Sequence, residues 1–204
     1  MTDLHNAGGI PGVLKTLFDG NIGLTDCTTV CERKLSEITR NVYVNNELIR
    51  SCSNPVTQKA GLGVLYGNIA QNGCVTKISG IDEKCYEFEG VANPFDSEEE
   101  AMFALENDLV KAGDVIIIRY EGPKGGLRMR ELSIPAAMLV GMGLHTSCAM
   151  VTDGIFSGVT RGSCIGHVVP EARDGDIIEI DIDARTTGVR GYSGINSAKE
   201  DELL

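Results

Sequence analysis

The residues best suited to chemistry lie in three glycine-rich stretches between Glu121 and Glu171. These stretches read EGPKGGLRMRE, VTDGIFSGVTRG and GHVVPEA, and they contain Glu131, Ser157 and His167. A glycine-rich backbone can approach a ligand closely because glycine has no Cβ, although bare turns use the same freedom. A hydroxyl, a carboxylate and an imidazole in such loops could take a proton, hold a metal ion or bind a substrate.

The spacing of the glycines excludes three familiar motifs. Ser157 has Gly154 three residues before it and Gly158 directly after it, whereas a nucleophile elbow needs glycines two before and two after the serine. The pair at 125–126 lacks the Gly-Lys-Ser/Thr ending of a P-loop, and Gly-Met-Gly at 141–143 is not completed by a third glycine. A serine-hydrolase elbow and both nucleotide motifs are therefore excluded.

Several single residues allow more than one interpretation. Glu131 could be a metal carboxylate or an acid of a first helical turn, and His145 and His167 could be bases, ligands or hydrogen-bonded loop residues. Cys27 and Cys31 could share one face of a helical turn, but no second pair or histidine completes a zinc or iron–sulfur set. We interpret the two cysteines as buried thiols.

Four short helices are predicted to position these loops. Pro11 suits a first helical turn, and Ser97 followed by Glu100 has the capping-box spacing. The predicted helices are Gly9–Gly20, a segment carrying Leu35, Ile38 and Val42, a segment after Ser97 that buries Met102, Leu105 and Leu109, and Ser133–Gly141.

Strands are expected between the helices. The run Val115–Tyr120 is typical of a strand buried on both faces, and isoleucines alternate with acids over 176–183. A short strand is expected at 149–152, and a hairpin is expected from 62–69 and 74–78 with its turn at Asn72-Gly73. The mixture predicts an α/β fold with few, short helices.

Length and charge limit the classes of function. The 204 residues suit one domain, and 18 Lys plus Arg against 29 Asp plus Glu give a net charge of −11, which argues against a nucleic-acid partner. No apolar run is long enough for a membrane span and no signal pattern begins the chain, so we expect a cytoplasmic protein. Seven scattered cysteines suit reduced thiols. We expect the domain to cover residues 1–185 and a disordered tail to cover 186–204.

Long strings of the sequence resemble the C-terminal domain of the dihydroxy-acid dehydratase and phosphogluconate dehydratase family. The matching strings are DLHNAGGIPGVL, GLGVLYGNIAQNGCVTKISG, FEGVANPFDSEEEAM, GDVIIIRYEGPKGGLRMRE and VTDGIFSGVTRGSCIGHVVPEA, which together span roughly residues 1–182. The YEGPKGG and TDG-x-FSG forms are most similar to the dihydroxy-acid dehydratase branch, which implies a place in branched-chain amino acid biosynthesis.

The resemblance implies a swivelling β/β/α domain, a barrel-like mixed sheet flanked by short helices. It also implies a reaction in which water leaves a 2,3-dihydroxy carboxylate to give a 2-oxo acid. Ser157 corresponds to the residue that takes the C2 proton, and Glu131 to a Mg²⁺ ligand. Arg130, His167 and Glu171 correspond to other recurring positions, and we expect them to have only a supporting role in shaping the pocket. Gly158 is a further expected pocket residue.

The resemblance also implies a cofactor and a partner domain, whose ligands are not among the residues of this sequence. The family's iron–sulfur cluster is held by cysteines of an N-terminal domain, and none of the seven cysteines here matches a cluster ligand. We therefore expect an N-terminal dehydratase domain as partner, in cis or in trans, sharing the Mg²⁺, and we expect a homo-oligomer.

Two departures from the family pattern leave a second hypothesis open. Ile155 stands where an arginine is usual beside the serine, and Thr29–Glu32 differs from the usual TVTG, so the identity of the substrate stays open. The Ile155 change, together with a tail that matches no family string, motivates the second hypothesis. The alternative is a non-catalytic module on the same fold that binds a small ligand or another protein.

Overall fold

The computed structural model describes residues 1–23, 27–58, 61–123, 130–157, 160–168 and 174–190. The chain divides into two compact units, Met1–Lys59 and Ala60–Leu204. Among the described residues, no helix has the length and apolar character needed to cross a membrane.

The described residues of the first unit form three helices and a small core. The helices are α1 (Thr2–Asn6), α2 (Gly9–Asp19) and α3 (Leu35–Thr39), so the predicted helix at Gly9 is confirmed, with Gly20 as its C-cap residue. Few of its described side chains are buried, whereas several large apolar side chains are exposed, namely Ile10, Ile22, Val30, Tyr43, Leu48 and Val56. So small a core supplies little stability to a unit of this length.

The described residues of the second unit form a closed barrel of eight strands with two α-helices. In chain order the elements are β1 (Gly63–Gly67), β2 (Ala70–Thr76), β3 (Glu87–Phe95), α4 (Glu98–Glu106), β4 (Asp114–Ile118), α5 (Ser133–Gly141), β5 (Ala149–Thr152), β6 (Ser163–Gly166), β7 (Ile177–Asp181) and β8 (Thr186–Val189). Two 3₁₀ turns, Ile78–Gly80 and Glu83–Cys85, precede β3. Around the barrel the order is β1-β2-β6-β5-β4-β3-β7-β8. The predicted α/β fold with a barrel-like mixed sheet is confirmed.

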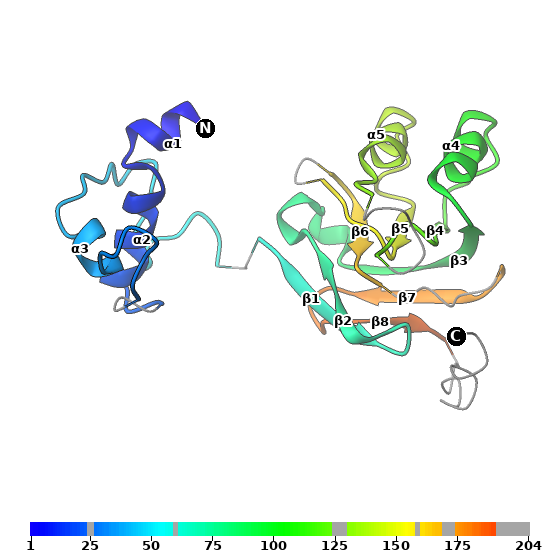
Figure 1. Ribbon diagram of the computed structural model, residues 1–204. Helices are drawn as coiled ribbons and strands as arrows, with labels where there is room; N and C mark the ends of the chain where they lie inside the picture. The colour runs from blue at the N-terminus through cyan, green and yellow to red at the C-terminus, as the bar shows by residue number, and fades with distance from the viewer. Residues whose placement is uncertain (24–26, 59–60, 124–129, 158–159, 169–173, 191–204) are drawn as a thin grey trace. The chain divides into compact units, whose positions relative to one another are not determined.

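Four neighbouring strands of the barrel are parallel. β3 pairs with β4, β4 with β5 and β5 with β6 in parallel, while β1 with β2, β2 with β6, β3 with β7 and β7 with β8 are antiparallel. The pair that closes the barrel, β1 with β8, is also parallel. Helices α4 and α5 make the crossovers from β3 to β4 and from β4 to β5, and they lie on the same side of the barrel (Figure 1). The carboxyl ends of the parallel strands therefore meet at one edge of the sheet.

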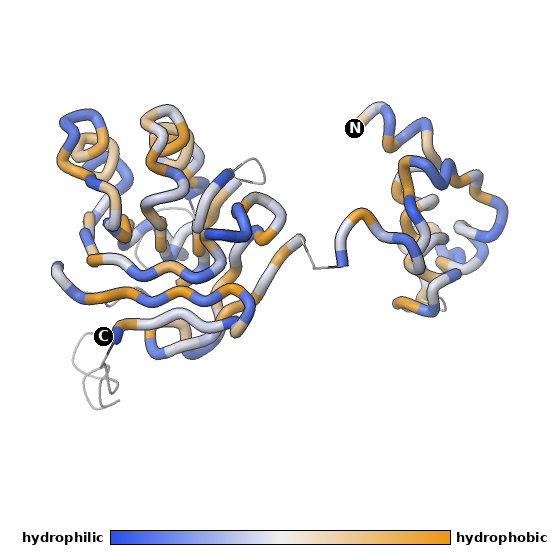
Figure 2. Tube along the Cα trace, turned by 180° about the vertical axis from the view of Figure 1, so that it is seen from behind, coloured by the Kyte–Doolittle hydropathy of each residue, from blue (hydrophilic) through white to orange (hydrophobic). Residues whose placement is uncertain are grey.

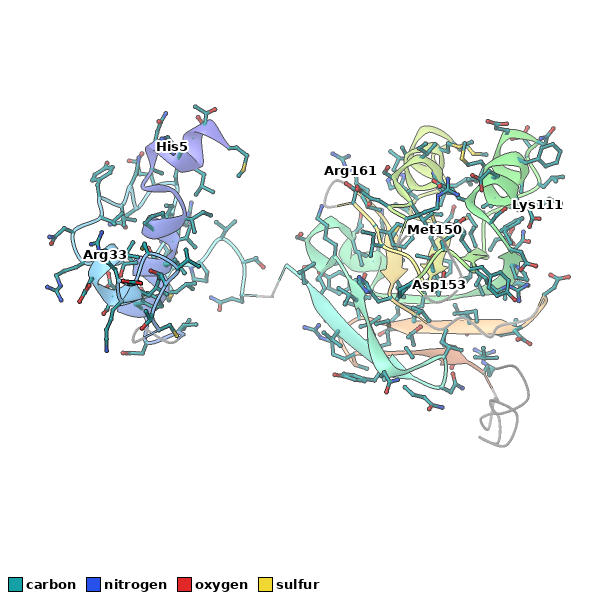
Figure 3. The ribbon with its side chains drawn as sticks, in the orientation of Figure 1. His5, Arg33, Lys111, Met150, Asp153 and Arg161 are labelled. Atoms are coloured by element: carbon teal, nitrogen blue, oxygen red, sulfur yellow. The ribbon has the colours of Figure 1, made fainter. Side chains whose placement is uncertain are left out.

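Two apolar cores explain the long apolar run of β4. Val115 and Ile117 belong to the core inside the barrel, whereas Ile116 and Ile118 pack under the helices with Leu105. On β5, Met150 belongs to the core under the helices and lies there in Figure 3. Hydrophobic and hydrophilic segments alternate along the strands of the barrel (Figure 2), as half-buried strands require.

The predicted hairpin is confirmed, but the predicted position of its turn is wrong. β1 pairs antiparallel with β2 and Gly67 opposes Ala70, so the connection lies at Asn68 and Ile69. The Asn72-Gly73 step lies inside β2, where Gly73 has a φ of +86° and the register shifts. The positive φ that favours a turn is used here in a β-bulge.

Three further expectations differ from the structure. The chain continues past residue 185 into β8, which closes the barrel between β7 and β1, so residues 186–189 are part of the fold, and 191–204 lie outside the described residues. Leu109 is exposed, because α4 ends at Glu106 and Val110 takes the buried place. Cys27 and Cys31 are exposed thiols, not buried ones.

Candidate functional site

Several side chains that could take part in a reaction follow the carboxyl ends of the parallel strands. Glu121 comes shortly after β4, Ser157 follows β5 and His167 follows β6. Asp153, the first residue after β5, lies at this edge in Figure 3 and accepts a hydrogen bond from the Glu121 amide at 3.0 Å. In open α/β sheets, ligands bind outside the carboxyl ends of the parallel strands, and the parallel strands of this barrel present the same kind of edge.

A cavity of about 100 Å³ opens beside Ser157. His167 also lines it, so the structure brings together two of the residues expected in the site. The other described residues that line the cavity are Leu62, Val75, Lys77, Ile155, Phe156, Thr160, Gly162, Cys164 and Gly166.

A backbone hydrogen bond links Ser157 and Thr160, which both line the cavity. The amide of Thr160 donates to the carbonyl oxygen of Ser157 at 3.1 Å. The Thr160 side chain is buried, and its Oγ1 has no hydrogen-bond partner among the described residues.

The backbone after β6 supports the segment that carries Ser157. His167 has a φ of +60°, and its amide donates to the carbonyl oxygen of Gly154 at 2.9 Å. A Cβ on Gly166 would come within 3.2 Å of the same oxygen, so the close approach favours glycine there.

Glu131 is held opposite Ile155, two residues before Ser157. The two residues form a parallel β-bridge, in which the Ile155 amide donates to Arg130 and the Leu132 amide donates to Ile155. The Glu131 side chain is exposed and does not line the cavity. The structure therefore brings the Glu131 and Ser157 segments side by side without placing both side chains in one cavity.

Arg130 lies in an acidic cluster rather than in the cavity. Its guanidinium pairs with Glu98 at 3.1 Å, Glu99 at 2.9 Å and Glu121 at 3.2 Å. Glu98 and Glu121 are buried, and Glu121 also accepts from the Glu98 amide at 2.8 Å. Burial raises the pKa of Glu98, opposed by the nearby Arg130 charge, while hydrogen bonds from its own amide and from Arg130 lower the pKa of Glu99. This arrangement holds Arg130, the residue before Glu131, and Arg130 does not line the cavity.

The remaining predicted pocket residues fall outside the described part of the chain, namely Gly158 and Glu171. Lys77 and Thr160 are cavity residues that the sequence analysis missed. Thr160 follows Ser157 in the GVTRG string, which was the available signal. Lys77 is far away in sequence and reaches the cavity because β2 pairs with β6, with Thr76 opposite Ile165.

The described residues do not form a complete metal site. No group of three or more His, Cys, Asp or Glu side chains among them could hold an ion. Glu131 offers one exposed carboxylate, so a metal ion bound there needs its other ligands from residues beyond this set.

A family model and individual relatives from the same family both match this chain. The family model described as dihydroxy-acid/6-phosphogluconate dehydratase C-terminal matches residues 47–195. That match starts well after Met1, so most of the first unit lies before it.

Individual relatives match across most of the chain. The dihydroxy-acid dehydratase of Citrifermentans bemidjiense is 49% identical over 199 residues, covering 93% of this chain and 35% of the relative. Those of Methanococcus vannielii and Caldanaerobacter subterraneus are 48% and 46% identical, covering 89% and 92% of this chain. The chain spans about a third of the length of these relatives, 34% and 36% in the last two.

Proposed function

Because the chain belongs to the dihydroxy-acid/6-phosphogluconate dehydratase family, we propose that it is the C-terminal catalytic portion of a hydro-lyase. The proposed reaction removes water from a 2,3-dihydroxy carboxylate and yields a 2-oxo acid. The observation that carries the proposal is the position of Ser157, which lines a cavity with Lys77 and His167 at the carboxyl ends of the parallel strands.

Ser157 is the proposed proton acceptor. Its oxygen takes the proton from C2, the electron pair left behind forms the C2–C3 double bond, and the C3–O bond breaks. The departing hydroxide takes up the proton that Ser157 received and leaves as water, which restores the serine alkoxide, and the resulting enol tautomerises to the 2-oxo acid. A serine hydroxyl is a weak acid, and a positive charge nearby favours its alkoxide form. Lys77 supplies one such charge at the cavity.

We also propose that the remaining metal ligands of the reaction lie in a second part of the enzyme. Glu131 would contribute one carboxylate to a shared Mg²⁺ site, and its β-bridge to Ile155 holds it close to the serine segment. The relatives are about three times as long as this chain. We place the other Mg²⁺ ligands and the cysteines of an iron–sulfur cluster in a portion that corresponds to their remaining two thirds.

The test mixes this chain with the N-terminal portion of a matched dihydroxy-acid dehydratase and measures 2-oxo acid formation from a dihydroxy acid. We expect turnover with the wild-type chain and a loss of about 10²- to 10⁴-fold with Ser157→Ala, the range for a general base. Ser147→Ala is the control, because Ser147 hydrogen-bonds to Leu144 and does not line the cavity. Full activity of Ser157→Ala, or no turnover with the wild-type chain, would contradict the proposal.

A non-catalytic ligand-binding module is the second candidate, and the absence of a complete metal site among the described residues favours it. A dihydroxy acid would then raise the melting temperature of the chain by mass action equally in the wild type and in Ser157→Ala. The mixture with the N-terminal portion would show no turnover.

A further inference from the structure

The first unit, Met1–Lys59, buries too few side chains to keep its fold by itself. Among its described residues only Ala7, Gly12, Thr39 and Ile49 are buried. A domain of about 60 residues is marginal even with a proper core, because so short a chain buries a small share of its surface. The unit therefore needs a further surface to pack against, and its exposed apolar side chains are available for that contact.

A groove in this unit is lined by the end of α2 and by the segment 42–53. Its volume is about 650 Å³, and Val42 and Tyr43 are among the residues that line it. Tyr43 is 69% exposed. The charged side chains among the described lining residues, Lys15 and Asp19, pair with each other at 2.7 Å. Apolar members, an exposed tyrosine and neutralised charges suit contact with a protein surface better than binding of a charged small ligand.

The two sides of the groove are joined by close contacts within the unit. The Asn45 amide donates to the carbonyl oxygen of Ala7 at 2.8 Å, and Cys52 Sγ donates to that of Thr16 at 3.5 Å. A Cβ on Gly20 would come within 2.6 Å of the Cys52 sulfur, so the segment packs tightly against the end of α2. The groove is therefore a feature of the folded unit.

The relatives indicate which surface covers the groove. The family model for the C-terminal domain starts at residue 47, whereas the relative from Citrifermentans bemidjiense matches 93% of this chain. Most of the first unit therefore corresponds to sequence that this relative has ahead of its C-terminal domain. The match covers only 35% of the relative, so a much longer N-terminal portion is continuous with that sequence.

We propose that the N-terminal portion of the dehydratase docks in the groove between the end of α2 and the segment 42–53, with Tyr43 as a central contact. The inference shares its partner with the proposed function, but it concerns assembly and assigns the surface that the partner covers. Docking there adds the buried apolar area that the unit lacks, so the same contact would stabilise the first unit and join the two parts of the enzyme.

The thiol of Cys52 reports on access to the groove, because it lines the groove and is exposed. The test compares the 204-residue chain with the same chain fused behind the N-terminal portion of the Citrifermentans bemidjiense enzyme. Each protein reacts with a thiol reagent at pH 7, and mass spectrometry gives the labelling rate of the Cys52 peptide. Tyr43→Ala is made in both proteins, and Tyr66→Ala is the matched control, because Tyr66 is an exposed tyrosine on β1 of the second unit.

We expect Cys52 to be labelled at least about 10-fold more slowly in the fused protein than in the chain alone, because labelling then requires the docked surface to open. Tyr43→Ala should restore fast labelling in the fused protein, since a tyrosine buried at an interface contributes strongly to affinity. Tyr66→Ala should leave the slow rate unchanged. Cys74 and Cys164, which are buried in the barrel, should be labelled slowly in every protein. If they are labelled fast in the fused protein, that protein is misfolded, and the Cys52 rate in a mixture of the chain with the separate N-terminal portion decides.

Three results would overturn the inference. The first is an equal Cys52 rate with and without the N-terminal portion. The second is slow labelling in the chain alone, which would show that the barrel or a second copy covers the groove. The third is an equal effect of Tyr43→Ala and Tyr66→Ala. Turnover that depends on Ser157 together with an unprotected Cys52 would overturn the docking surface and leave the proposed reaction standing, whereas protection of Cys52 without turnover would do the reverse.

Discussion

The backbone amide of Ile155 donates to the carbonyl oxygen of Arg130 at 3.0 Å. This bond joins the segment that carries Ser157 to the segment that carries Glu131. The side chain of Arg130 is held in turn, because its guanidinium pairs with the buried carboxylates of Glu98 and Glu121. The acidic cluster therefore fixes the backbone from which Glu131 projects.

Replacing Arg130 by Met should destabilise the second unit. Glu98 and Glu121 would remain buried without their cation. Breaking a fully buried ion pair costs about 3–5 kcal/mol, and we expect about 1–3 kcal/mol here because the Arg130 side chain is 41% exposed. Urea unfolding measures the change. Glu99→Gln is the control, since Glu99 is 67% exposed and its loss should cost below about 1 kcal/mol. Equal losses in the two variants would contradict the assignment of the cluster.

The stability of Glu98→Gln relative to the wild type should depend on pH. Burial raises the pKa of Glu98, opposed by Arg130, so the folded state holds the proton more tightly than the unfolded state does. The contribution of Glu98 to the free energy of unfolding therefore falls as pH rises from about 4.3, the ordinary glutamate value, through the raised pKa. Glu98→Gln should melt higher than the wild type at pH 7, with a difference that shrinks toward pH 4.

Glu99→Gln should show the opposite trend in the same melting experiment. The pKa of Glu99 is lowered, first by its own amide and then by Arg130, so its contribution is present above the ordinary pKa and is lost as pH falls. This variant should melt slightly lower than the wild type at pH 7 and equally at low pH. Parallel pH curves for the two variants would contradict the two opposite pKa shifts.

Gly67→Ala should open the barrel where β1 meets β8. A Cβ on Gly67 would overlap the carbonyl oxygen of Thr187, which is backbone and cannot turn away. We expect a loss of about 3 kcal/mol or more in the free energy of unfolding, measured by urea denaturation. Gly141→Ala is the matched control, because it lies at the end of α5 with no atom near its added Cβ. That variant should gain about 0.5–1 kcal/mol from helix propensity.

Thiol labelling should separate the seven cysteines into two classes. Cys27, Cys31 and Cys52 are exposed, whereas Cys74, Cys85, Cys148 and Cys164 are buried. A hydrogen bond from Thr29 lowers the pKa of Cys31, while burial raises the pKa of Cys74 to about 11 and that of Cys164 to about 12. Because the thiolate is the reactive form, a coloured disulfide reagent at pH 7 should show three fast thiols and four slow ones. Cys31→Ser should remove the fastest phase, and a fast phase that survives this change would contradict the assignment.

Local patterns in the sequence determined most of the elements. The capping box at Ser97 begins α4, where the Glu100 amide donates to Ser97 Oγ at 3.2 Å. The apolar run after Gly113 is β4, and the alternating isoleucines are β7. These signals depend on hydrogen bonds and side-chain periodicity within a few residues, so they can be recognised without the rest of the fold.

The tertiary structure alone decided which strands neighbour one another and so which side chains share the cavity. The sequence identified Ser157, His167 and Glu131 as chemical residues, but Lys77 joins the cavity only because β2 pairs with β6. Likewise, the resemblance predicted Arg130 as a pocket residue, and the tertiary structure shows that its guanidinium pairs with glutamates of α4 and of the segment after β4. Pairings between distant strands and between distant charges depend on how the whole barrel closes, and no local pattern encodes that closure.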